Sequence, residues 1–242
     1  YMIGAYGVYY MVVSLGLNFL LALAISTLLI GGLGILLERL CFRPFRGQPD
    51  RALIISIGLI LVLQNVVLSI AGGTPKLFSN PFTGVLQILG TSISWERLSI
   101  VLIGFGLLAA LFLFVRMTKT GQAMLAISQD REGAALQGIN IDRISAVAMF
   151  FGCALAAIAG ALVGSLFSIS PTMGSFALMK GIAVIILGGL GSIPGAVVGG
   201  LILGLIDGIM PVLTTTYIAG LIGFAAIIII LIFRPRGIWG HE

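Results

Sequence analysis

Several stretches of about 20 residues in this chain contain almost no charged side chain, and these apolar runs limit the folds open to it. The hydrocarbon core of a bilayer is about 30 Å thick, which a helix crosses in roughly 20 residues. With 9% charged residues, the chain has too little polar surface to coat a water-soluble globule. The sequence therefore predicts an all-α integral membrane protein, a polytopic helical bundle. The runs are 19–37, 52–71, 99–115, 144–166 and 217–233, with a shorter one at 2–15.

The few ionisable residues exclude several classes of protein. The net charge of +5 is spread over short loops and does not form the basic face that a nucleic-acid-binding protein needs. The chain has one histidine, His241, and two cysteines, Cys41 and Cys153, so it offers no metal cluster, disulfide framework or Ser/His/Asp triad. No G-x-x-x-x-G-K-[ST] motif is present. We therefore predict no enzyme activity, no metal, no nucleic-acid partner, and ATP use only through another protein.

Lysine and arginine concentrate in two loops, and this asymmetry predicts the orientation in the membrane. The segments 38–51 and 116–143 carry four basic residues each, whereas the intervening segment 72–98 carries two. Cytoplasmic loops hold the excess of Lys and Arg, so we expect 38–51 and 116–143 inside. We expect 72–98 outside, with a hairpin around Gly90. The basic C-terminal tail should also be inside, which requires an even number of crossings after residue 143.

The glycine-rich block 181–210 must then cross the membrane twice or not at all, because the runs 144–166 and 217–233 already supply two crossings. Its centre combines a proline, which removes a backbone donor, with glycines that allow turn geometry. We predict two short helices that form a broken hairpin, whose irregular backbone is buried in protein or lines a polar cavity. The predicted hinge residues are Gly188, Gly189, Gly191, Pro194 and Gly195.

Small residues at every fourth position of two runs predict faces on which helices pack closely. Dimerisation through one of these faces is the alternative interpretation. The positions are Gly152, Ala156, Gly160 and Gly164 in the first run, and Gly200, Gly204 and Gly208 in the second.

Polar side chains inside membrane spans are costly, so each one is a candidate for a functional site. The residues predicted to line the substrate path are Ser56, Gln64, Asn65 and Asp207. Simpler interpretations stay open. Gln64 and Asn65 fix helix packing through a hydrogen bond between helices, whereas Asp207, with Lys180 at the other end of the glycine-rich block, is a solvated or snorkelling charge at the outer rim. Glu38, at an inner helix end, is expected to be solvated.

The segment 116–143 is long for a connector and predicts a cytoplasmic docking element for another protein. Two proline-free stretches rich in helix formers, 122–127 and 130–137, predict short helices broken near Ser128. Carboxylates in the first turn of the second helix suit its dipole. Its apolar residues 134–136 are expected to be exposed, and a helix lying on the lipid surface is the rival interpretation. The residues assigned to this coupling element are Gly121, Asp130, Arg131, Glu132, Ala134, Ala135, Leu136 and Gly138.

These stretches resemble the LivH-type permeases, the membrane subunits of bacterial ATP-binding-cassette importers for branched-chain amino acids. The resemblance spans nearly the whole chain, and the string Gly-Gly-Leu-Gly-Ser-Ile-Pro-Gly-Ala is its most specific part. Family members usually begin with a further hydrophobic segment, so the N-terminus is expected to be truncated. They also often carry Arg where this chain has Gln122 and Leu125. The segments that carry the resemblance are 1–6, 63–65, 119–140, 187–196 and 234–237.

The resemblance implies a single permease domain over 1–242 that forms half of a translocation path in the bacterial cytoplasmic (inner) membrane. Its implied partners are membrane lipid, a second permease subunit in a homo- or heterodimer, two cytosolic ATPase subunits that hold ATP and Mg²⁺, and an extracytoplasmic substrate-binding protein. This chain would bind no cofactor itself. ATPase closure would push the helices of 121–138 and open a cavity near Gln64 and Asn65 alternately to each side.

Alternatives to a branched-chain amino acid permease remain open at this point. Within the same family, the chain would be a permease for urea, amides or sugars. From other classes, it would be an ion-coupled secondary transporter, which needs ionisable residues near the midplane, or an intramembrane enzyme.

Overall fold

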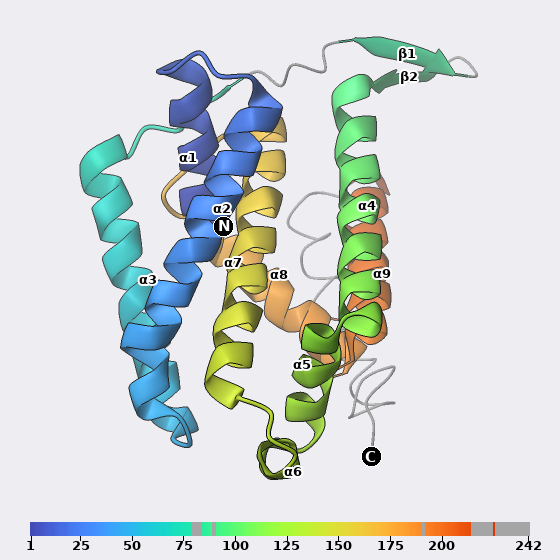
Figure 1. Ribbon diagram of the computed structural model, residues 1–242. Helices are drawn as coiled ribbons and strands as arrows, with labels where there is room; N and C mark the ends of the chain where they lie inside the picture. Colours follow the sequence, from blue (N-terminus) through green and yellow to red (C-terminus); the bar gives the residue numbers. More distant parts are fainter. Residues whose placement is uncertain (79–83, 89–90, 190–191, 214–224, 226–242) are drawn as a thin grey trace. The chain divides into compact units, whose positions relative to one another are not determined.

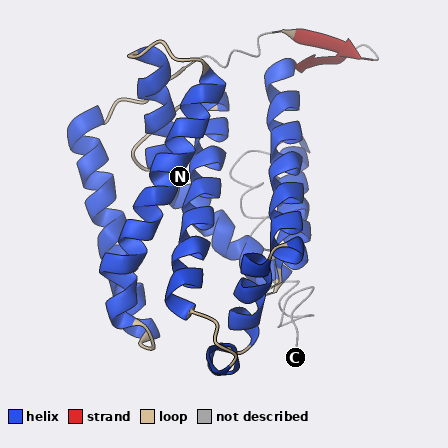
Figure 2. Ribbon diagram, viewed as in Figure 1, coloured by secondary structure: helices blue, strands red, loops and turns tan. Residues whose placement is uncertain are grey.

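The computed structural model describes residues 1–78, 84–88, 91–189, 192–213 and 225, and every structural statement below concerns these residues (Figure 1). They belong to two compact units, 1–174 and 175–242. Helices make up nearly all of the regular structure, with one small antiparallel β hairpin (Figure 2). The prediction of an all-α polytopic fold is therefore confirmed.

The helices and strands follow one another along the chain with short connections. The helices are α1 (Met2–Val13), α2 (Phe19–Leu37), α3 (Pro49–Ala71), α4 (Trp95–Met117), α5 (Lys119–Gln129), α6 (Arg131–Leu136), α7 (Ile141–Leu166), α8 (Met173–Gly188) and α9 (Ile193–Leu213). A π-helical turn, η1 (Glu38–Phe42), and a 3₁₀ turn, η2 (Arg43–Phe45), follow α2. The strands β1 (Val85–Ile88) and β2 (Thr91–Ser94) form the predicted hairpin, whose turn at Gly90 lies outside the described residues.

Five helical stretches among the described residues are long and apolar enough to cross a membrane. Four of them lie where the sequence predicts spans, and the fifth is α9 in the glycine-rich block. The predicted run 217–233 lies outside the described residues. The chain is thus a multi-pass membrane protein. The five stretches are Phe19–Phe45, Asp50–Ala71, Trp95–Met117, Ile141–Leu166 and Pro194–Leu213.

Side-chain caps explain where several helices of the first unit begin. An oxygen of the residue before the helix accepts a backbone N–H of the first turn, which satisfies a donor that the helix itself leaves unpaired. Asn18 does this for α2, Ser94 for α4 and Asn140 for α7. The helices therefore begin beside the polar loops, and the apolar runs between these loops stay continuous.

Helices α1, α2 and α7 form the core of the first unit because small residues let their backbones approach closely. A Cβ added to Gly4 would collide with Ala157 of α7, and one added to Gly34 would collide with Cys153. The hydroxyl of Ser26 on α2 donates to the carbonyl of Gly4 at 3.2 Å, which satisfies the polar group inside the bundle. Helices α2 and α7 therefore pack closely against each other, and both pack against α1.

The predicted small-residue faces are used in part. On α7, Gly160 meets the backbone of residue 1 and Gly164 meets the side chain of Ile169, whereas Gly152 has no neighbour within 4 Å among the described residues. On α9, a Cβ added to Gly199 would crowd α8 and one added to Gly200 would touch Val184 at 3.7 Å, whereas Gly204 and Gly208 have no neighbour within 4 Å among the described residues. The close contact of Gly188 with Gly195 holds this face of α9 against α8.

Candidate functional site

The coupling segment begins where α5 folds back on the end of α4. Thr118 caps α5, and its hydroxyl oxygen accepts the backbone N–H of Gly121 at 3.0 Å. Gly121 is buried, and a Cβ at this position would collide with the backbone of Phe114 and Val115. Only glycine allows this close approach, so Gly121 sets the angle at which the coupling segment leaves the bundle.

The second coupling helix, α6, is held by Asp130. The Asp130 carboxylate accepts the backbone N–H groups of Glu132 and Gly133, both at 3.0 Å. Asp130 is therefore the N-cap of α6, one position before the first turn in which we predict it. The break between the two helices falls at Asp130, near Ser128 as predicted. Gly138 follows the helix with a φ of 80°, a left-handed conformation that glycine adopts at little cost.

The apolar residues of α6 do not all face outward. Leu136 is 90% exposed, and Ala135 is also exposed, whereas Ala134 is 3% exposed and belongs to the interior. The prediction that all three are exposed is wrong for Ala134, because successive helical residues point about 100° apart and three in a row cannot share one face. The exposed apolar tip of the coupling segment is therefore Ala135 and Leu136.

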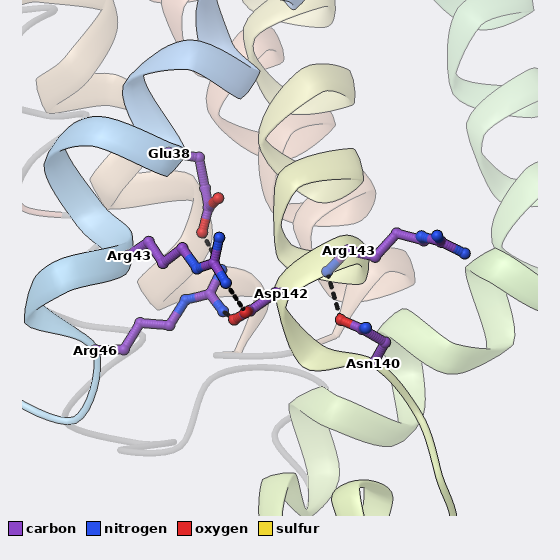
Figure 3. A network of polar contacts seen from close by, with 6 residues as sticks. All are labelled: Glu38, Arg43, Arg46, Asn140, Asp142 and Arg143. Atoms are coloured by element: carbon purple, nitrogen blue, oxygen red, sulfur yellow. Dashed lines mark hydrogen bonds and ion pairs between the residues drawn. The ribbon is translucent and has the colours of Figure 1, made fainter.

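A cluster of ion pairs, which the sequence did not predict, joins the end of α2 to the beginning of α7 (Figure 3). Arg46 contacts both Glu38 and Asp142, and Arg43 also contacts Asp142. Glu38 is 5% exposed, so the expectation of a solvated carboxylate is wrong. We call these four residues, Glu38, Arg43, Arg46 and Asp142, the α2–α7 latch.

The α2–α7 latch lies beside a cavity of about 330 Å³. Asp142 stands in the first turn of α7, six residues after the end of the coupling helix α6. Asn140 caps α7 by accepting the N–H of Arg143 at 3.0 Å. The Arg143 side chain points away from the latch (Figure 3). The coupling helices α5 and α6 lie at the same end of the first unit as the latch, opposite the β hairpin (Figure 1).

At the opposite end of the first unit, Lys76 links the segment after α3 to helix α1. Its ammonium group donates to the hydroxyl of Tyr10 at 3.1 Å and lies 5.3 Å from the centre of the Tyr9 ring, within cation–π distance. The hydrogen bond to Tyr10 raises the pKa of Lys76, so this residue stays charged throughout the physiological range. Its backbone forms a β-bridge with Ile169 after α7.

The predicted substrate-path residues of α3 form local hydrogen bonds. Ser56 donates to the carbonyl of Leu53 at 2.7 Å, and the Asn65 amide donates to the carbonyl of Leu61 at 2.8 Å. Asn65 is exposed and Gln64 is half-buried. The structure therefore places Gln64 and Asn65 together on α3, and their role in the substrate path stays a prediction.

The break in the glycine-rich block is confirmed. Helix α8 ends at Gly188, and Gly189 follows with a φ of 98°. The backbones of Gly188 and Gly195 touch, so that a Cβ on either would collide with the other. Pro194 stands in the first turn of α9, where its missing N–H costs nothing. Gly191 lies outside the described residues, and α9 is longer than the short helix we predicted.

Lys180 on α8 and Asp207 on α9 form an ion pair, with Nζ 2.6 Å from Oδ2. The contacts of Gly188 with Gly195, and of Val184 with Gly199, show that α8 and α9 are antiparallel. Lys180 and Asp207 are therefore cross-helix partners, and their side chains are 59% and 37% exposed. Elsewhere in the described part of the chain, no group of three or more His, Cys, Asp or Glu side chains could hold a metal ion.

The sequence of this chain is similar to those of known proteins over most of its length. Residues 1–232 match the family model described as "Branched-chain amino acid transport system / permease component". The chain is 36% identical to the high-affinity branched-chain amino acid transport system permease protein LivH of Escherichia coli K12, over 85% of this chain and 69% of that protein. It is 33% identical to the corresponding permease protein BraD of Pseudomonas aeruginosa, over all of this chain and 83% of that protein.

Other matches are shorter. The fructose import permease protein FrcC of Rhizobium meliloti is 34% identical, over 40% of this chain and 29% of that protein. No solved structure matches the chain. Because the family model covers all but the last ten residues of the 242, the chain belongs to the family of permease components of branched-chain amino acid transport systems.

Proposed function

We propose that this chain is the permease subunit of an ATP-binding-cassette importer and forms the translocation path for branched-chain amino acids across the inner membrane. The observation that carries this proposal is the family match over nearly the whole chain, with 36% identity to LivH. The chain does no covalent chemistry itself. The single terminal histidine and the lack of a P-loop motif support this part of the proposal.

The partners in this proposal follow from the family to which the chain belongs. Two cytosolic ATPase subunits hold ATP and Mg²⁺, and a second permease subunit, identical or different, completes the path. An extracytoplasmic binding protein delivers the amino acid. The coupling helices support an ATPase contact, because the neighbouring Ala135 and Leu136 expose apolar surface at the end of α6, outside the spanning stretches.

The mechanism begins at the coupling segment. When the ATPase subunits close, they push α5 and α6. Helix α6 continues through Gly138 into α7, whose Asp142 is held by Arg43 and Arg46 after α2. Because α2 and α7 also pack closely along their length, the push tilts both helices together. A rigid-body tilt of this kind opens a transport path alternately to each side.

A sugar permease of the same family is the second candidate. The 34% identity to FrcC favours it, but this match covers only 40% of the chain. The amino acid permeases match over most of the chain or all of it. An ion-coupled secondary transporter and an intramembrane enzyme are disfavoured by the family.

The proposal is tested by reconstitution in liposomes with the ATPase, second permease and binding protein of the same system. We expect ATP-dependent uptake of radiolabelled leucine by the full complex, and neither uptake against a gradient nor ATP hydrolysis by this chain alone. Fructose and urea serve as control solutes. Uphill uptake by the chain alone, or uptake of fructose in place of leucine, contradicts the proposal.

A further inference from the structure

The ion pair between Lys180 and Asp207 joins the shorter apolar helix α8 to α9, a helix long and apolar enough to cross the membrane. Asp207 is in the spanning stretch Pro194–Leu213, six residues from its nearer end, which corresponds to about 9 Å of helix. Lys180 is near the middle of the 16-residue helix α8, seven residues after its beginning at Met173, which corresponds to about 10 Å of helix. Ionisable residues at such depth are costly and mark functional sites.

The space around this pair is open in the described part of the chain. The side chains of Lys180 and Asp207 are 59% and 37% exposed. Three glycines stand beside them: Gly181 follows Lys180, and Gly204 and Gly208 lie before and after Asp207. A Cβ added to any of these glycines has no heavy atom within 4 Å. A molecule of a few heavy atoms can therefore reach both charged groups.

We propose that Lys180 and Asp207 bind the charged end of an α-amino acid during transport. The Lys180 ammonium takes the substrate carboxylate, and the Asp207 carboxylate takes the substrate ammonium. This inference rests on the proposed function and deepens it by assigning the residues that recognise the substrate class.

The charge balance favours an amino acid over other solutes. In the resting state the two side chains neutralise each other, so the pair carries no net charge into the membrane. A zwitterion separates them and supplies an opposite charge to each, so the loaded site is neutral as well. A sugar has no charge to offer, and an amine or a carboxylic acid would leave one of the two side chains unpaired, which is costly in an apolar environment. The apolar side chain of a branched-chain amino acid can lie on the apolar residues of the same helices, such as Met179 and Leu205.

The experiment measures radiolabelled leucine binding to the assembled permease–ATPase complex in nanodiscs, without ATP and without binding protein. The single variants Lys180→Gln and Asp207→Asn each lose one charged hydrogen bond, so we expect leucine binding weaker by about tenfold or more. Asp50→Asn removes an exposed carboxylate at the beginning of α3 and is the matched control. We expect it to bind leucine as the wild type does.

Two analogues separate recognition from a purely structural ion pair. 4-Methylpentanoate lacks the ammonium group of leucine, and 3-methylbutylamine lacks the carboxylate. The ratio of leucine affinity to 4-methylpentanoate affinity should be smaller in Asp207→Asn than in the wild type. The ratio of leucine affinity to 3-methylbutylamine affinity should be smaller in Lys180→Gln than in the wild type. A structural ion pair produces neither pattern.

The exchanged variant, Lys180→Asp with Asp207→Lys, keeps the ion pair and so preserves folding even if the single variants unfold. We expect it to melt near the wild-type temperature but to bind leucine poorly, because the reversed charges turn the substrate side chain away from its apolar contacts.

Wild-type leucine binding by the exchanged variant or by both single variants overturns the inference, as does a wild-type complex that binds no leucine. If wild type and variants import leucine equally well, this inference fails and the proposed function stands. If the wild-type complex imports none, the proposed function itself fails.

Discussion

Glu38 shows how a single residue departs from its sequence-based expectation. A carboxylate beside a run of arginines at a helix end is normally solvated, but here it is 5% exposed and contacts Arg46. Arg46 in turn contacts Asp142, which lies 104 positions after Glu38 in the sequence. Periodicity and spacing carry no information about such a pair, because it depends on how α2 and α7 pack. The one signal in the sequence is that a charged side chain near the end of a membrane-spanning helix needs an oppositely charged partner.

The substitution Glu38→Gln should destabilise the protein. It leaves Arg46 without its buried counter-ion, which costs several kcal/mol when no other partner exists. Because Arg46 also contacts Asp142, we expect a smaller loss of about 2 kcal/mol in the free energy of unfolding. Chemical denaturation in detergent measures it, with the exposed Asp50→Asn as the control. Equal stability of Glu38→Gln and the wild type would show that the pair contributes nothing.

Gly121→Ala tests the angle at which the coupling segment leaves the bundle. A Cβ at this position collides with the backbone of Val115, so α5 has to move away from α4, at a cost of about 1–3 kcal/mol. We expect the binding-protein-stimulated ATPase activity of the reconstituted complex to fall strongly. Gly106→Ala on α4, where the Cβ meets open space, should leave that activity intact. Normal stimulation in Gly121→Ala would mean that α5 tolerates displacement.

At the scale of the elements, the sequence carries most of the information. Runs of apolar residues predicted four of the spanning helices, because the bilayer thickness fixes their length. The glycines and the proline around 188–195 predicted the break between α8 and α9. The sequence could not predict which face of α9 packs, since the close contact of Gly188 with Gly195 sets that rotation. It also could not show that Lys180 and Asp207 meet, because their pairing depends on that same rotation of α9 against α8.

The coupling helix α6 offers a test of docking that leaves its fold intact. Leu136 is 90% exposed, so Leu136→Ser removes apolar surface without opening a cavity. We expect the ATPase subunit to bind about tenfold more weakly, as expected for a leucine side chain that is buried in the contact, with an unchanged melting temperature. Co-purification at graded salt or surface plasmon resonance measures this affinity. Gln137→Ser, at the exposed neighbouring position, is the control, and undiminished ATPase binding by Leu136→Ser would exclude the docking role.

At the scale of the whole molecule, the helices α3 and α4 are little covered by the other described residues. In each of their spanning stretches only 6% of residues are buried, against 33% in α7. Such apolar faces are covered by lipid or by other subunits. The first unit therefore consists of a packed core, α1, α2 and α7, with α3 and α4 exposing most of their surface. This arrangement suits a subunit of a larger complex, and the moving part we infer is the core pair α2 and α7.

The α2–α7 latch predicts a variant in which ATP hydrolysis continues without transport. Asp142→Asn removes the charge that holds Arg43 and Arg46 to the first turn of α7, while the coupling helices α5 and α6 keep their caps and their exposed tip. The ATPase subunits should therefore bind and hydrolyse ATP at nearly the wild-type rate, but α7 would move without α2. We expect leucine uptake per ATP hydrolysed to fall several-fold, measured by parallel uptake and phosphate-release assays on the same proteoliposomes.

Asp50→Asn, at the same end of the first unit but outside the latch, should keep the wild-type ratio. An Asp142→Asn complex with the wild-type ratio would show that close packing alone couples the two helices, since glycine contacts such as that of Gly34 with Cys153 remain in this variant.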